Sequence, residues 1–428
     1  MSDLDKSGAR KDFLAPFLTM VALFFFQGFL TSANGQFQEP VKSALLANAV
    51  GIKNTLMTLI TFSWFIPYFI FGRTGAVMVS KYGYKGTLLR ALGIMTFGLL
   101  VFAVSSVVPI SEGWLLTGYK IPLGYFVFLL GSFVVGSGVT ILQVVTNPYV
   151  ISCQVRGTQD IQRLNIAGTA SSIGNTLAPY LVTGVIFAGV ALEQVNISDV
   201  FWPFIGVALL FIVMITLLSK AALPEIANTH VAVGEKLERS VWSFKHLSLG
   251  VLAIFFYVGE EVAIGNNVKS YAISLGMGEA SSTLMPTLYW GALLVGRLIS
   301  SFMSKVPSRT QLTVTTMSAV ILVLFAAFFN SPWLLVAVGL CHSVMWSAIF
   351  TLALKGMGKY KSVATGALMM GVLGGAIIPL LQGVFADMLK NDWQWTWLFI
   401  AVGEIYMLYY SLWGSRIRPQ DNVEEGER

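Results

Sequence analysis

Long apolar segments alternate with short polar ones along the whole chain. Most of the apolar segments approach or exceed the roughly 20 residues that a helix needs to cross a bilayer. They are apolar in continuous blocks, whereas barrel strands would alternate apolar and polar side chains. The pattern predicts twelve membrane-spanning helices, at residues 13–35, 54–79, 87–108, 122–152, 164–189, 200–218, 247–271, 283–303, 311–329, 332–355, 364–388 and 394–414.

The longest polar connection, residues 219–246, divides the predicted helices into two sets of six. We therefore expect an all-α membrane protein with 12 transmembrane helices in two six-helix bundles. The expected parts are an N-terminal bundle at 1–218, a cytoplasmic linker at 219–246, and a C-terminal bundle with a short cytoplasmic tail at 247–428. Paired bundles of this kind are typical of secondary transporters, which hold their substrate near the middle of the membrane.

Composition and charge agree with a chain dissolved in lipid. Hydrophobic residues make up 55% of it and charged residues 11%, with a mean hydropathy of +0.73. The net charge of +6 does not indicate a nucleic-acid partner, because 22 of the 27 basic residues fall on the side of the N-terminus. By the positive-inside rule, both termini should be cytoplasmic and the protein should span the inner (plasma) membrane. The basic residues on the other side are Lys42, Lys53, Lys120, Lys269 and Lys390.

Two adjacent acids lie at the middle of the seventh predicted helix. A charge at that depth costs about 2.5 to 3.5 kcal/mol on insertion scales, so Glu260 and Glu261 need an explanation. Neighbours on a helix point about 100° apart, so at most one of them faces the centre of the protein squarely. We favour Glu261 as a proton carrier and keep Glu260 as the second candidate. The alternative is a structural ion pair with a basic group such as Arg297.

Neutral amide side chains recur inside the predicted helices. Gln143 and Asn147 lie one turn apart and share a face, with Pro148 next in the chain. Amides both donate and accept hydrogen bonds, which suits an uncharged, hydroxylated ligand. Hydrogen bonding between helices explains a single amide equally well. The candidate substrate-binding amides are Gln27, Asn34, Gln143, Asn147, Asn165 and Gln382.

Aromatic and histidine side chains add weaker candidates. Trp290 and Trp346 lie inside predicted helices, where an indole ring either stacks on a ligand ring or packs against a helix. His342 lies inside the tenth helix, and a lone buried histidine is more typical of hydrogen-bonded packing than of titration. No phosphate-binding glycine loop or metal-ligand cluster is recognisable in the sequence. We therefore expect no enzyme activity, no cofactor, no metal and no ATP-driven step.

Six ordered segments resemble one transporter family. They are residues 26–34 (FQGFLTSAN), 138–150 (GVTILQVVTNPYV), 163–167 (RLNIA), 256–265 (FYVGEEVAIG), 350–358 (FTLALKGMG) and 374–383 (GGAIIPLLQG). Together they resemble the fucose/glucose/galactose:proton symporter family of the major facilitator superfamily. The resemblance implies a secondary active transporter that imports a small neutral sugar, of the L-fucose, glucose or galactose type, by alternating access with a proton.

Two departures from the family pattern bear on coupling. The family has an Asn-Asp pair where this chain has Asn34 and Gly35, and the fucose branch has a glutamate where this chain has Gln143. The glutamine favours the glucose/galactose branch, and the missing aspartate leaves Glu261 as the acid best placed for coupling. Sodium coupling, uncoupled sugar transport and export of another small molecule are the alternatives. Among exporters, an organic-anion carrier should place a basic residue at mid-span, and no arginine clearly lies there. We expect a monomer surrounded by lipid.

Overall fold

The computed structural model describes residues 13–46, 53–116, 118–181, 197–221, 223–224, 237–303, 305–389 and 392–423. Within these residues, eight helices are long and apolar enough to cross a membrane, judged by length and composition. Helices suit a lipid environment because each backbone N–H and C=O group finds its partner within the same segment.

The first group of helices contains the longest helical run. The second and third predicted spans form a continuous run in α2, which is broken only at Gly83, where φ is 69°. Glycine adopts a positive φ without steric cost, so this residue allows the chain to reverse between the two spans. The elements of the group are α1 (Leu14–Leu45), α2 (Lys53–Val107), α3 (Leu123–Ser152), α4 (Asp160–Tyr180), η3 (Ile197–Val200) and α5 (Phe201–Lys220).

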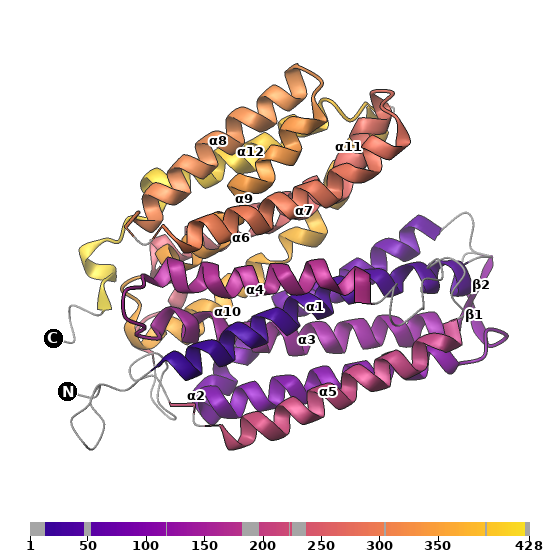
Figure 1. The fold of residues 1–428 in the computed structure, drawn as a ribbon, viewed down its shortest axis with the longest axis horizontal. Helices are drawn as coiled ribbons and strands as arrows, with labels where there is room; N and C mark the ends of the chain where they lie inside the picture. The colour runs from indigo at the N-terminus through magenta and orange to yellow at the C-terminus, as the bar shows by residue number, and fades with distance from the viewer. Residues whose placement is uncertain are drawn as a thin grey trace.

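A short hairpin connects α2 to α3. Strands β1 (Gly113–Leu116) and β2 (Tyr119–Pro122) are antiparallel, with Gly113 opposite Pro122 and Leu116 opposite Tyr119. The hydrophobic pattern predicted helices only, and four-residue strands are too short to give a periodic signal. Figure 1 shows the hairpin at the end of the molecule opposite the start of α1.

The second group of helices covers the rest of the described chain. The predicted span at 364–388 is formed by two consecutive helices, α10 and α11, and the last helix continues into a π-helical turn at Tyr410–Gly414. Each predicted span is therefore matched by helix, in whole or in part, among the described residues. The α-helices of this group are α6 (Lys245–Ser274), α7 (Glu279–Ser301), α8 (Ser308–Phe328), α9 (Pro332–Leu354), α10 (Lys361–Gly371), α11 (Gly374–Met388) and α12 (Thr396–Tyr409). Short helical turns lie at η4 (Val241–Ser243), η5 (Gly358–Tyr360) and η7 (Pro419–Asp421).

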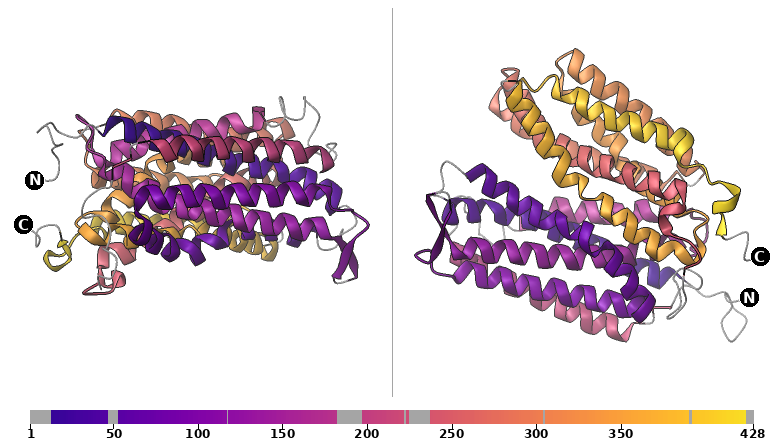
Figure 2. Two further views of the ribbon diagram at one scale, coloured as in Figure 1. Left: turned by 90° about the horizontal axis from the view of Figure 1, so that it is seen from below. Right: turned by 180° about the vertical axis from the view of Figure 1, so that it is seen from behind.

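The two groups of helices approach each other at one end. The start of α1 and the turn η7 lie at this end, and the groups diverge toward the opposite end (Figure 1; Figure 2, right). At the approach, α2 contacts α10, and α4 contacts α7. A Cβ added at Gly72 would lie 2.3 Å from the carbonyl oxygen of Gly366, and one added at Gly366 would lie 2.5 Å from that of Gly72. The two helix backbones therefore touch, and small residues are what allow such an approach.

The outer faces of the helices are apolar. In helix α5, Trp202 is 73% exposed and Leu217 is 65% exposed. Leu209 and Val213 of the same helix are exposed as well. Apolar surface of this extent is unfavourable in water but fits the hydrocarbon of a bilayer. Together with the apolar helices, it identifies a multi-pass membrane protein.

Candidate functional site

Arg297 connects the two groups of helices where they approach. It lies near the end of α7, and its side chain is 15% exposed. Its guanidinium donates to Ser172 Oγ at 2.7 Å and to the Gly168 carbonyl oxygen at 3.4 Å, both on α4. It also forms an ion pair with Glu261 on α6, at 3.4 Å. One buried side chain thus ties an acid of the second group to the backbone and side chain of the first.

Amide side chains on α4 extend this contact along α7. Asn165 Nδ2 donates to Ser300 Oγ at 2.6 Å, and Gln162 Nε2 donates to the Ser301 carbonyl oxygen at 2.6 Å. Ser300 in turn donates to Gln311 Oε1 at 2.8 Å. Asn165, predicted to bind substrate, therefore lies in a hydrogen-bonded contact that closes the end of the molecule near the termini.

A second cluster joins α2, α3 and α9. Gln143 and Asn147 share a face of α3, as their spacing predicts, and both are buried. Gln143 Nε2 donates to the Tyr68 hydroxyl at 2.9 Å, and Asn147 Nδ2 donates to the Gln143 carbonyl oxygen at 2.9 Å. Trp346 Nε1 on α9 donates to Asn147 Oδ1 at 3.4 Å. The structure thus brings two predicted amides and a predicted tryptophan together between the two groups of helices.

The adjacent acids on α6 point to different partners. Glu261 faces Arg297, which is the structural pair that the sequence left open as an alternative. Glu260 is 1% exposed and faces away from Arg297, toward Glu404 on α12. The roughly 100° between neighbours on a helix accounts for this separation. Arg297 lies near the end of α7 and not at its middle, and its side chain reaches the interface between the two groups.

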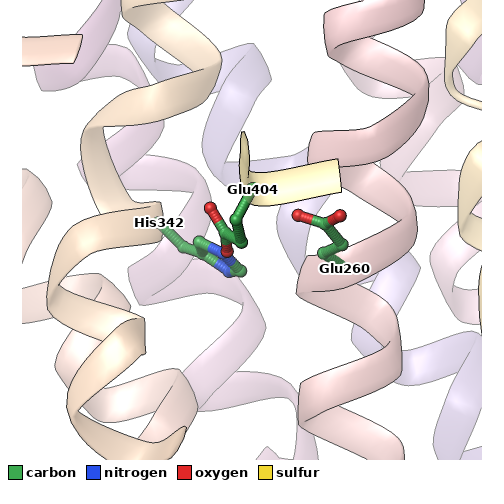
Figure 3. A group of neighbouring side chains, drawn as sticks. All are labelled: Glu260, His342 and Glu404. Carbon is green, nitrogen blue, oxygen red and sulfur yellow. The ribbon is translucent and has the colours of Figure 1, made fainter. Parts of the chain in front are cut away.

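The Glu260 side chain belongs to a buried polar cluster. His342 Nε2 lies 2.6 Å from Glu404 Oε1, and His342 Nδ1 lies 2.7 Å from the Tyr289 hydroxyl. One oxygen or nitrogen atom from each of Glu260, His342 and Glu404 lies within 4.8 Å of the other two. Figure 3 shows the Glu404 side chain between His342 and Glu260. The cluster therefore joins the middles of α6, α7, α9 and α12.

This donor set is the one among the described residues that could hold a metal ion. Both nitrogens of His342 already lie within hydrogen-bond distance of a partner, Tyr289 or Glu404, so a metal ion would have to displace one of these contacts. Hydrogen bonding, and with it proton exchange, is the chemistry that the arrangement supports best.

The remaining predicted residues do not join these clusters. Gln382 is hydrogen-bonded on both sides within the second group, to Asn267 and Thr396. Trp290 is 41% exposed and packs against α6, where a Cβ at Gly265 would lie 2.6 Å from its ring. Gln27 lies on α1 and keeps a buried Oε1 without a hydrogen-bond partner in the described structure. The side chain of Asn34 lies outside the described residues.

Glu404 is the residue that sequence reasoning missed. It is a single acid within the apolar stretch of α12, and it is fully buried. The rule that drew attention to Glu260 and Glu261, that a charge at membrane depth needs a reason, applies to it equally. The sequence offers no signal that pairs it with His342, which lies 62 positions earlier in the chain.

Comparisons with known proteins cover almost the whole chain. It is 30% identical over 420 residues to the glucose/galactose transporter of Brucella abortus biovar 1 (strain 9-941), covering 96% of this chain and 97% of that protein. It is 29% identical over 414 residues to the putative glucose/galactose transporter of Helicobacter pylori J99, covering 92% and 96%. It is 23% identical over 420 residues to the L-fucose-proton symporter of Escherichia coli K12, covering 90% of each.

The fold is similar to that of solved transporters. Two crystal structures of the E. coli fucose:proton symporter FucP, one of them described as the outward conformation, match with TM-scores of 0.80 and 0.78 at 19% identity. Both cover 95% of this chain and 100% of the symporter chain. The family model of the Major Facilitator Superfamily matches residues 24–376. The chain belongs to the major facilitator superfamily.

Proposed function

We propose that this chain imports a neutral monosaccharide of the glucose, galactose or fucose type across the inner membrane by alternating access, coupled to protons. The observation that carries the proposal is the 30% identity, over 96% of the chain, to a protein named glucose/galactose transporter. The fold of a fucose:proton symporter supports it, and so do the neutral polar side chains between the two groups of helices.

The proposed sugar site is built on Gln143, Asn147 and Trp346. The Asn147 amide and the Trp346 indole meet between α3 and α9, and the Gln143 amide, one turn away on α3, donates to Tyr68 on α2. Hydroxyl groups of a sugar can replace these hydrogen bonds. The Trp346 ring offers a face for stacking on the sugar ring. Gln27, Asn34 and Trp290 are further candidates for contacts, whereas the hydrogen bonds of Asn165 and Gln382 favour roles in helix contact.

The proposed coupling residue is Glu261. When ionised, it holds Arg297, and the same guanidinium binds Gly168 and Ser172 on α4. A proton on Glu261 removes one charge of the pair, so Arg297 is held less firmly and the contact with α4 weakens. Proton binding and opening of this end of the molecule are thereby linked. With both termini in the cytoplasm, the closed end is the cytoplasmic one, and the conformation faces outward.

Sugar-induced proton movement in proteoliposomes tests the function. The purified protein would be given fucose, glucose, galactose, mannose, fructose or N-acetylglucosamine, with and without sodium. We expect one of these sugars to make the outer medium alkaline and to accumulate inside without sodium. No response to any sugar from folded protein overturns the sugar assignment, and a response that needs sodium overturns proton coupling.

Substitution of Glu261 tests the coupling residue. Glu261→Gln should abolish sugar-induced proton movement, while exchange of labelled for unlabelled sugar continues. The matched control is Glu238→Gln, because Glu238 is a glutamate whose side chain is 81% exposed and which pairs with Lys359 at 3.4 Å. Unchanged proton movement in Glu261→Gln contradicts the assignment.

A further inference from the structure

Two carboxylic acids face each other in the core of the second group of helices. Glu260 on α6 is 1% exposed and Glu404 on α12 is fully buried (Figure 3). The fit depends on the residue before Glu404, because a Cβ at Gly403 would lie only 1.6 Å from Glu260 Oε1. The glycine thus provides the space that the Glu260 carboxyl group occupies. The contact between α6 and α12 at this point depends on Gly403 having no side chain.

The hydrogen bonds around the two acids are incomplete. Glu404 Oε1 interacts with His342 Nε2, but Oε2 of Glu404 and Oε2 of Glu260 are both buried without a hydrogen-bond partner. An ionised carboxylate can only accept hydrogen bonds, so two ionised groups cannot satisfy each other. A proton held between Glu260 and Glu404 supplies the missing donor.

The charges around the cluster lead to the same conclusion. Among the ionisable side chains that face it in the described part of the chain, the one permanent cation is Arg297, which is already paired with Glu261. Two adjacent buried carboxylates without a cation of their own are strongly unfavourable at membrane depth. The side chains that face the cluster from the packed helices are Tyr257 and Glu261 on α6, Tyr289 and Arg297 on α7, and Cys341 on α9.

The histidine determines how protons can be arranged. A hydrogen bond from Tyr289 O–H to His342 Nδ1 leaves Nε2–H to donate to Glu404 Oε1, so a neutral imidazole satisfies both contacts. With one proton between the two carboxyl groups, the cluster carries a single negative charge. A further proton on the cluster makes it neutral. The chain Tyr289–His342–Glu404–Glu260 therefore offers hydrogen-bonding positions for a proton that is gained or lost.

We propose that Glu260 and Glu404, with His342 as their hydrogen-bonded partner, form a proton-binding site separate from Glu261, and that sugar accumulation requires the proton held there. The role in accumulation rests on the proposed function, whereas the shared proton does not. Glu260 and Glu261 are adjacent on α6, so a change in the position of Glu260 also moves the acid that holds Arg297. The buried pair can in this way influence the contact with α4.

Infrared spectroscopy of the purified full-length protein tests the shared proton without any transport. A protonated carboxyl group has a C=O stretching band, sensitive to hydrogen–deuterium exchange, that ionised carboxylates lack. We expect this band in the unchanged protein at neutral pH, and its loss in Glu260→Gln. The matched control is Glu261→Gln, which should keep the band because Glu261 is paired with Arg297. Loss of the band in Glu261→Gln, with retention in Glu260→Gln, overturns the proposal.

A second variant guards against misfolding. In Glu404→Gln, the amide can donate to Glu260 and hold the cluster together, so we expect folded protein without the band. Purified protein would also be analysed for Zn²⁺ and Mn²⁺. A stoichiometric metal that is lost in both variants overturns the proton site in favour of a metal site, and an absent band in the unchanged protein rejects a shared proton.

Accumulation tests the role in transport. A gradient of one pH unit across the vesicle and one coupled proton support about tenfold accumulation of sugar, because a factor of ten corresponds to about 1.4 kcal/mol. We expect Glu260→Gln and Glu404→Gln to reduce accumulation to no excess over the outer concentration, while sugar exchange continues. Full accumulation in both variants overturns the role in transport. Absence of sugar exchange in the unchanged protein contradicts the proposed function instead and leaves the infrared result intact.

Discussion

The two groups of helices bring different chemistry to the middle of the molecule. Helix α3 of the first group offers the neutral amides of Gln143 and Asn147, which hydrogen-bond to Tyr68 and Trp346. Helices α6, α7, α9 and α12 of the second group contribute ionisable side chains, in the Glu261–Arg297 pair and in the cluster around Glu404. Amides recognise hydroxyl groups at any pH, whereas buried acids respond to protons. Under the proposed function, the first group supplies the amides of the sugar site, with Trp346 of the second group, whereas the acids proposed to bind protons all belong to the second group.

The largest effect should come from removing the charge that joins the two groups. Arg297→Gln leaves Glu261 buried without its cation, which costs about 3 to 5 kcal/mol for a broken buried pair. We expect a large fall in the melting temperature of the purified protein and loss of proton-coupled uptake. Adding Glu261→Gln to the same chain should restore part of the stability, because no uncompensated charge is left.

A control for this experiment is available on the first group. Arg90→Gln changes an exposed arginine, which donates to the Gly86 carbonyl oxygen on its own helix and lies over the Tyr82 ring. It should change the melting temperature little, since exposed interactions of this kind contribute about 1 kcal/mol or less. A double variant of Arg297 and Glu261 that is no more stable than Arg297→Gln alone speaks against the ion pair.

The space beside Glu260 gives the next largest effect. Gly403→Ala places a methyl group where the Glu260 carboxyl group lies, and overpacking of this kind costs about 1 to 3 kcal/mol. We expect a lower melting temperature, loss of accumulation and weak perturbation of sugar binding. Gly206→Ala on α5 is the matched control, because nothing lies within 4 Å of a Cβ at that position. Equal behaviour of the two variants contradicts the tight fit.

The amide region should respond in the opposite way. Asn147→Ala removes the acceptor of Trp346 and a candidate sugar contact, with a cost of about 1 to 3 kcal/mol for a buried polar group left without its partner. We expect weaker sugar binding, measured by the sugar concentration that half-saturates uptake, and an unchanged pH dependence. A variant with a shifted pH dependence of uptake and an unchanged sugar affinity would contradict the role of Asn147 in sugar binding.

The smallest change tests one hydrogen bond. Trp346→Phe keeps an aromatic ring but removes the indole N–H that donates to Asn147, a contact worth about 0.5 to 1.5 kcal/mol. Sugar affinity should fall by up to about tenfold at the upper end of that range, while the melting temperature changes little. Loss of all binding would show that the indole ring has a larger role than this hydrogen bond, and no change would exclude Trp346 from the site.

The sequence predicted features that depend on local spacing. The helix positions follow from apolar runs, and the shared face of Gln143 and Asn147 follows from a separation of four residues, which is about one helical turn. The divergence of Glu260 and Glu261 follows from the same geometry. The β1–β2 hairpin was not predicted, because short irregular elements leave no periodic signal.

Long-range pairing could not be predicted in this way. Gln382 and Asn147 are both amides inside apolar helices, yet one is held by Asn267 and Thr396 while the other meets Trp346 across the two groups. Their local sequences do not indicate which hydrogen-bond partners each amide has. Only the rotation of each helix and the identity of its neighbours do so, and both depend on how all the helices pack.

The sequence by itself thus determined that the chain crosses a membrane many times, and that a few polar residues lie at membrane depth, because the cost of burying polar groups in lipid depends on each segment alone. Only the tertiary structure decided that Glu261 pairs with Arg297 and that Glu260 pairs with Glu404 beside His342. Hydrogen bonds and ion pairs form over about 3 Å, and residues as far apart in the chain as His342 and Glu404, 62 positions, reach that distance only when the helices have packed together.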